Sequence, residues 1–107
     1  MSWARLWLGD GELDGVRLLS SETVQRMFAS DNTSDGGNAA VDELTWHSGH
    51  DLAGYSLWGH GGSDPGVGTD LLMLREKRLA AIVFANTDGI SAGDFAIEML
   101  REGLAGL

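Results

Sequence analysis

The sequence predicts an α+β fold, in which helices pack on a small antiparallel sheet of three or four strands. The strand-like apolar runs 67–74 and 79–85 are separated by only four charged residues, a connection suited to an antiparallel hairpin. Apolar residues at helical spacing occur near both ends of the chain. A length of 107 residues suffices for one domain or part of one.

The first segment is predicted to be the end of a helix. Trp3, Leu6 and Trp7 recur at helical spacing, and Gly9 stops the run. A helix that starts with two tryptophans suggests the tail of a longer helix. The glycine-rich turn signals that follow, at 9–11 and 14–15, predict a short hairpin-like link.

A second helix is expected to run through Ala29, because Ser20 or Ser21 can cap its N-terminus. The buried stripe of this helix is expected to consist of Val24, Met27 and Phe28. Residues 30–38 are all Asp, Asn, Ser, Thr or Gly, which predicts a flexible surface loop.

The second half of the chain is expected to form the sheet and a final helix. The strands are expected at 44–47, 55–59, 67–74 and 79–85. Residues 86–89 carry turn chemistry, and Ser91 can then cap the helix. Its apolar surface is expected to come from Phe95, Ile97, Met99 and Leu100.

The composition excludes several classes of protein. With 16 acidic against 7 basic residues the net charge is −9, so nucleic acids and anionic membranes are poor partners. There is no cysteine, and no apolar run approaches the ~18–20 residues of a membrane span. The start lacks a basic leader and a small-residue cleavage pattern, so we expect no signal peptide; the compartment stays open. No motif calls for a cofactor.

The most informative stretch is 59–66, which holds four glycines and a proline in eight residues. Such a segment predicts that the backbone, rather than a side chain, comes close to another group. A lone imidazole, His60, stands at its entrance. This pattern is typical of one wall of an active site.

Taken in order, these features resemble the C-terminal part of the serine β-lactamase-related family, which includes class C β-lactamases, D,D-peptidases and related esterases. The resemblance is carried by 11–20, 58–66 and 83–86 and runs along nearly all of the chain. It implies that residues 1–107 are a C-terminal segment of a β-lactamase/transpeptidase-like domain.

The family builds its site from three motifs: Ser-x-x-Lys, Tyr-x-Asn or Ser-x-Asn, and Lys-Thr-Gly or His-x-Gly on a strand. The run His60-Gly61-Gly62 is similar to the third. The resemblance implies catalytic roles for His60, as a cation or hydrogen-bond donor, and for Ser63, whose backbone N–H matches an oxyanion-hole donor. Gly61 and Gly62 are implied to bind substrate, although Gly61 replaces a hydroxyl residue.

The other two motifs cannot be carried over. The only lysine is Lys77, with Leu74 three positions before it, and the only tyrosine is Tyr55, followed two positions on by Leu57. Residues 30–32, Ser-Asp-Asn, match the alternative second motif Ser-x-Asn. This run lies in the polar loop, and it is closer to His60 in the sequence than the family's usual spacing. We therefore expect a segment that is inactive alone and that needs an N-terminal fragment carrying the nucleophile.

Two other groups of polar residues have competing interpretations. A cluster at 47–51 contains two histidines and an aspartate, but a solvated hairpin turn explains it better than a metal site. His60, Ser63 and Asp64 are the residue types of a triad, yet neighbours in sequence seldom face one another, and a capped glycine turn is the better interpretation. His60 itself is either functional or a structural histidine at a strand end.

Two further functional readings stay open beside the hydrolase segment. One is a non-catalytic module that pairs with a copy of itself or with another chain, and the other is a truncated reading frame. Open strand edges or helix faces predict self-association or marginal folding. The residues expected to form an uncovered patch are Trp3, Leu6, Trp7 and Trp58.

Overall fold

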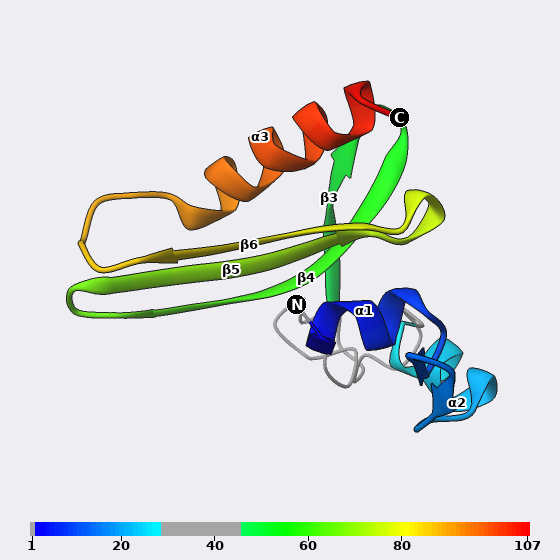
Figure 1. Cartoon of the computed structure of the whole chain (residues 1–107). Helices are drawn as coiled ribbons and strands as arrows, with labels where there is room; N and C mark the ends of the chain where they lie inside the picture. The colour runs from blue at the N-terminus through cyan, green and yellow to red at the C-terminus, as the bar shows by residue number, and fades with distance from the viewer. Residues whose placement is uncertain (1, 29–45) are drawn as a thin grey trace, which may run out of the picture. The chain divides into compact units, whose positions relative to one another are not determined.

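The structure is a computed structural model that describes residues 2–28 and 46–107, without the side chains of Gly49 and His50. The chain divides into two compact units, Met1–Ser48 and Gly49–Leu107. Helices and antiparallel strands occur together, and a helix packs on a four-stranded sheet, so the predicted α+β class is confirmed. Figure 1 shows the order of the elements along the chain.

The first unit begins with the predicted helix, α1 (Ser2–Leu8). Its last turn closes when the N–H of Gly9 donates to the carbonyl of Arg5 at 2.8 Å. The strands β1 (Glu12–Leu13) and β2 (Val16–Arg17) then form the expected hairpin. Asp14 and Gly15 both have positive φ, the geometry of a type I′ turn, so the turn prediction is confirmed.

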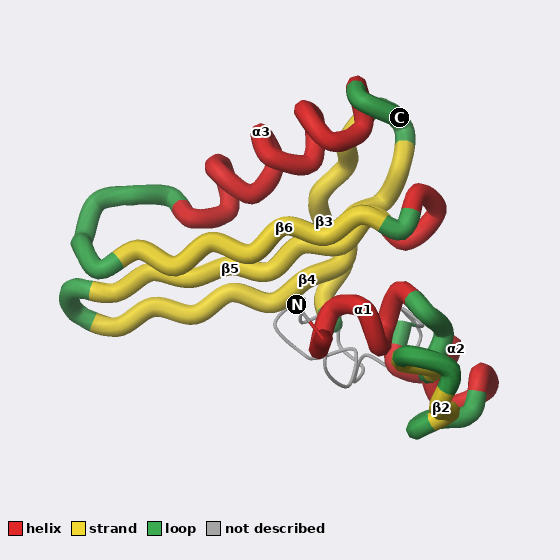
Figure 2. The backbone as a smooth tube through the Cα atoms, viewed as in Figure 1, coloured by secondary structure: helices red, strands yellow, loops and turns green. Residues whose placement is uncertain are grey.

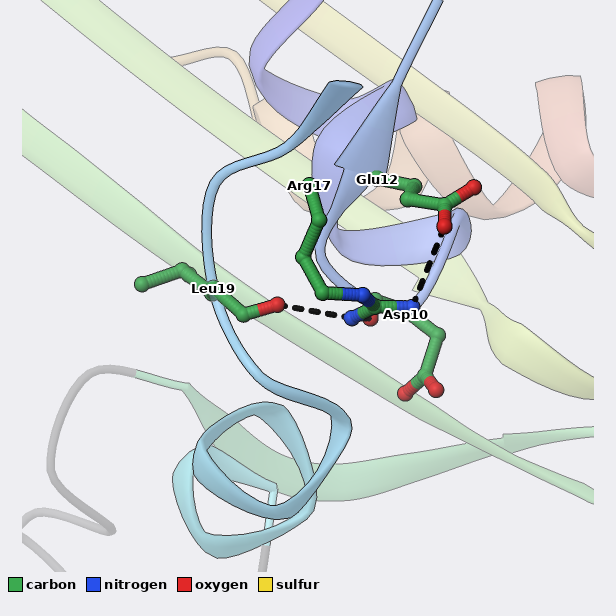
Figure 3. Close-up of polar contacts among 4 residues, drawn as sticks. All are labelled: Asp10, Glu12, Arg17 and Leu19. Atoms are coloured by element: carbon green, nitrogen blue, oxygen red, sulfur yellow. Dashed lines mark hydrogen bonds and ion pairs between the residues drawn. The ribbon is translucent and has the colours of Figure 1, made fainter. Parts of the chain in front are cut away.

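Arg17 holds the ends of this hairpin together, as Figure 3 shows. Its Nη1 donates to the backbone carbonyls of Asp10 and Leu19, at 3.0 and 2.7 Å. Its Nη2 lies 3.4 Å from a carboxylate oxygen of Glu12. Gly11 lies between these groups with φ +95°, and a Cβ there would be 2.2 Å from the Leu19 carbonyl oxygen. Only glycine fits this position.

The second helix is α2 (Ser21–Met27), and its cap is the predicted Ser20. The hydroxyl of Ser20 accepts a hydrogen bond from the backbone N–H of Thr23 at 3.1 Å. Val24 is buried as predicted, and so is Phe28, the residue that caps the C-terminus. Ala29, the polar loop 30–38 and the first two residues of the predicted strand 44–47 lie outside the described residues.

Three aromatic rings form the centre of the first unit. Trp7 meets Phe28 and Trp46 edge to face, with ring centroids 5.9 and 5.5 Å apart, and Phe28 stacks on Trp46 at 6.1 Å. All three residues are buried. The expected uncovered patch is thus largely wrong: Leu6 and Trp7 are buried and Trp58 is half-buried, while Trp3 is 55% exposed.

The sheet of the second unit has the strand order β3-β4-β5-β6 (Figure 2). Its strands are β3 (His47–Leu52), β4 (Tyr55–Asp64), β5 (Val67–Leu74) and β6 (Leu79–Ala85). The predicted strands 67–74 and 79–85 have the observed bounds. A 3₁₀ turn at Arg75–Lys77 joins them, and Arg78 completes the connection in the left-handed conformation.

Two predictions about this sheet are wrong. Residues 47–51 belong to a strand and not to a hairpin turn; the turn lies at Ala53 and Gly54, which both have positive φ. The strand that starts at Tyr55 does not stop at Gly59 but continues through the glycine-rich stretch to Asp64. Glycine weakens a strand through its entropy but does not prevent it, and here the pairing with β5 holds the segment extended.

The last helix is α3 (Ala92–Ala105), capped by Ser91 as predicted. It packs on β5 and β6. Its buried residues are Ala92, Ala96 and Leu100, which recur at a spacing of four. Of the four residues expected to supply apolar surface, Leu100 and Ile97 pack in or against the core, whereas Phe95 and Met99 are 56% and 52% exposed. Small alanines let the helix approach the sheet closely, and Leu100 packs in the core, whereas Phe95 and Met99 face outward.

The core of the second unit lies between α3 and one face of the sheet. It consists of Leu52, Leu57, Leu72, Leu74, Ala81, Ala96 and Leu100. Side chains alternate between the two faces along each strand. The position of Leu57 in this core therefore assigns every residue of β4 to either the α3 face or the opposite face.

Candidate functional site

The four predicted site residues, 60–63, occupy consecutive positions of β4. Because Leu57 lies on the α3 face, alternation places Gly61 and Ser63 on that face as well. His60 and Gly62 lie on the opposite face. His60 is exposed and pairs across the sheet with Leu71 of β5.

The backbone of this segment also alternates, in the plane of the sheet. Thr69 of β5 lies opposite Gly62, and its hydroxyl donates to the Gly62 carbonyl at 3.3 Å. The polar backbone groups of Gly62 therefore face β5. Since successive residues direct their N–H and C=O to opposite sides, those of Gly61 and Ser63 point away from β5.

On the side away from β5, the neighbour of β4 is β3. β3 is shorter than β4, with 6 residues against 10. The turn between the two strands lies at Ala53 and Gly54. Among the described strands, only β5 pairs with β4 at Gly61–Ser63. We call this segment the open edge.

The imidazole of His60 reaches the same edge. Its Nδ1 lies 2.8 Å from the carbonyl oxygen of Gly61, which points outward. A carbonyl can only accept, so Nδ1 carries the proton in this hydrogen bond. In the neutral ring, Nε2 is then the nitrogen that accepts hydrogen bonds. The open edge thus combines an imidazole with the outward N–H of Ser63.

One glycine of this segment, Gly59, is required by the sheet itself, and Gly62 is closely packed. A Cβ on Gly59 would lie 2.2 Å from the carbonyl oxygen of Leu71 and 2.6 Å from Leu72 Cδ2. A Cβ on Gly62 would lie 3.2 Å from the Thr69 hydroxyl. The sequence predicts that the backbone of this segment comes close to another group. In the structure, one such group is the neighbouring strand β5.

A shallow hollow of about 490 Å³ adjoins the open edge. Its lining residues are Gly61, Gly62, Ser63, Gly68, Thr69, Asp70, Ile90, Ala92 and Gly93. A second hollow of about 380 Å³ shares Ser63 and lies at the turn after β4. His60 lines neither of these two hollows. The structure therefore brings Gly61, Gly62 and Ser63 together at one hollow and places His60 at the edge beside it.

Two aspartates near the site were not predicted. Asp70 lies opposite Gly61, and its carboxylate is so close to α3 that a Cβ on Gly93 would be 2.8 Å from Asp70 Oδ2. Asp88 accepts a hydrogen bond from the N–H of Gly66 at 2.7 Å and so ties two turns together. A charged residue in the middle of an apolar strand was the sequence signal for Asp70.

The alternative constellations find little support among the described residues. Ser63 lies on the face opposite His60 and Asp64, so these three do not form a triad. Within the described side chains, no group of three His, Cys, Asp or Glu could hold a metal ion; the side chain of His50 is outside them. None of the described helices is both long and apolar enough to cross a membrane.

The only lysine and the only tyrosine lie together, away from the open edge. The Nζ of Lys77 is 5.5 Å from the ring centroid of Tyr55, a cation–π contact. Tyr55 starts β4, and His60 follows five residues later, a distance of roughly 16 Å along a strand. The run 30–32 lies outside the described residues.

The comparisons with family models, with curated proteins and with solved structures found no match to this chain.

Proposed function

We propose that this chain is a C-terminal segment of a β-lactamase-related serine hydrolase and forms one wall of a cleft for acyl transfer. The reaction class is the transfer of an acyl group from an ester, an amide or a β-lactam. The observation that carries the proposal is the open edge, where the N–H of Ser63 points away from β5 beside the imidazole of His60.

Each residue of the open edge has a role in this proposal. The N–H of Ser63 donates to the oxyanion that develops when a nucleophile attacks the acyl carbonyl. His60 supplies a hydrogen bond or takes up a proton through Nε2. Gly61 and Gly62 line the adjacent hollow and leave room for the acyl group. The nucleophile comes from an N-terminal fragment that carries Ser-x-x-Lys and Tyr-x-Asn.

The test supplies such a fragment by co-expression and compares two substitutions at one position. Ser63→Pro removes the backbone N–H, whereas Ser63→Ala removes only the hydroxyl. Proline is tolerated where the N–H points to a free strand edge, so both variants are expected to fold. We expect Ser63→Pro to lower the turnover of a chromogenic ester about 100- to 1,000-fold, the usual effect of losing one oxyanion donor.

The matched variant decides how the result is interpreted. Ser63→Ala is expected to keep the turnover of the wild-type complex within about 3-fold, because the proposed donor is the backbone. Circular dichroism of both variants checks that the sheet is intact. Equal activity of a folded Ser63→Pro complex and the wild-type complex would refute the oxyanion role.

A further inference from the structure

The outer edge of β6 differs from ordinary edge strands. β6 is the last strand of the sheet, and among the described strands only β5 lies beside it. All seven of its residues are apolar, and none is charged, proline or glycine. Natural edge strands usually carry a charge, a proline or a bulge that prevents pairing with another chain. A strand that is apolar throughout is typical of a position between two neighbours.

The side chains next to this edge are also poorly covered. Ala81 and Val83 contribute to the core under α3. By alternation, Ile82 and Phe84 lie on the opposite face. Ile82 is half-buried, and Phe84 is 80% exposed. β6 therefore presents a row of backbone groups together with an exposed phenyl ring.

The charges at the two ends of β6 are complementary. Three of the seven basic residues of the chain directly precede the strand: Arg75, Lys77 and Arg78. Asp88 follows the strand after a short turn. Antiparallel pairing of two β6 strands brings the basic end of each beside the acidic end of the other. Parallel pairing would place like charges together, which is unfavourable.

We propose that two copies of this chain pair along β6, antiparallel and about a twofold axis near Ile82. The pairing joins the two four-stranded sheets into one and satisfies the backbone groups of both edges. In this register Phe84 of one copy lies opposite Ala80 of the second copy, on the same face. A large side chain thus packs beside a small one. The inference goes beyond acyl transfer and does not depend on it.

Cysteine cross-linking tests the register, because the chain has no cysteine of its own. Residues that face each other across an antiparallel pair have Cα atoms about 4.5–5.5 Å apart, within the range of a disulfide. Ile82→Cys is therefore expected to form an intermolecular disulfide on mild oxidation. Phe95→Cys, at a more exposed site on α3, is expected to stay monomeric on a non-reducing gel.

A mixture of variants distinguishes the two orientations. Ala80→Cys and Phe84→Cys are expected to cross-link efficiently when mixed and poorly when each is alone. Efficient cross-linking of each variant with itself would indicate a parallel pair and overturn the proposed arrangement. Efficient cross-linking of Ser63→Cys with itself, but not of Ile82→Cys, would move the contact to the open edge of β4 and also overturn it.

Sedimentation velocity tests whether the dimer exists without a cross-link. We expect a dimer whose fraction rises with protein concentration. Phe84→Lys is expected to raise its dissociation constant about 10-fold or more, because a lysine on an edge strand opposes pairing with another strand. Phe95→Lys serves as the matched control and is expected to dimerise as the wild type does. A wild-type chain that stays monomeric at every concentration, or a dimer that only Phe95→Lys disrupts, refutes the proposal.

Discussion

At the scale of single residues, Gly59 and Gly68 show how differently two glycines of one sheet are constrained. A Cβ on Gly59 would meet the Leu71 carbonyl oxygen at 2.2 Å, far inside van der Waals contact. A Cβ on Gly68 would meet nothing nearer than the Ile90 carbonyl oxygen at 3.8 Å. The neighbouring strand leaves no room for a side chain at Gly59, whereas a methyl group at Gly68 would fit without a clash.

Gly59→Ala is expected to lower the free energy of unfolding by about 1–3 kcal/mol, because the added methyl group forces β4 and β5 apart. Gly68→Ala is expected to leave the free energy of unfolding unchanged or to raise it by up to about 1 kcal/mol. Urea denaturation followed by circular dichroism measures both. Equal destabilisation by the two substitutions would contradict the packing described for Gly59.

At the scale of elements, α3 shows that the face of a helix is set by its partner. The helix contains bulky apolar residues that do not pack on the sheet, such as Phe95, which is exposed. Its neighbour Ala96 is buried instead. Adjacent residues of this helix are therefore expected to contribute very differently to the free energy of unfolding. Leu100 is buried in the core of the second unit, whereas Met99 is half exposed to solvent.

Leu100→Ala is expected to lower the free energy of unfolding by about 2–5 kcal/mol, through lost burial and the cavity it leaves. Met99→Ala should change it by no more than about 0.5 kcal/mol. Thermal and urea unfolding of the two variants at one protein concentration provide the comparison. If the Met99 variant were the less stable, α3 would have to face the sheet differently.

At the scale of the whole molecule, the 107 residues contain one lysine and one tyrosine. Ser-x-x-Lys does not occur in the sequence, and the single lysine and single tyrosine contact each other away from the open edge. In the proposed function, Ser63 and His60 act on an acyl group only when an activated nucleophile is supplied, because covalent catalysis requires one.

The isolated chain is accordingly expected to hydrolyse neither a chromogenic ester nor a chromogenic β-lactam above the buffer rate. Mass spectrometry after incubation with a β-lactam probe is expected to show the unmodified chain. A stoichiometric adduct on any serine would show that a nucleophile exists, and Ser63 would be the first residue to substitute by alanine.

Much of the local structure could be predicted because it depends on short-range chemistry. The caps Ser20 and Ser91 follow from side chains that satisfy nearby N–H groups, and the strands 67–74 and 79–85 follow from long apolar runs. The extension of β4 to Asp64 could not be predicted in this way. Its glycines favour turns locally, and the pairing with β5 that overrides this preference is formed by residues further along the chain.

The sequence by itself determined the α+β class, the caps, the absence of a Ser-x-x-Lys motif and the candidate run at 60–63, since each depends on residue identity and near spacing. The tertiary structure decided which sides of these residues are available. Pairing with β5 turned the N–H of Ser63 outward, and among the described strands only β5 pairs with that part of β4. The packing of α3 through Ala96 left Phe95 outside. Such choices depend on contacts between distant segments, which the local pattern of a chain does not contain.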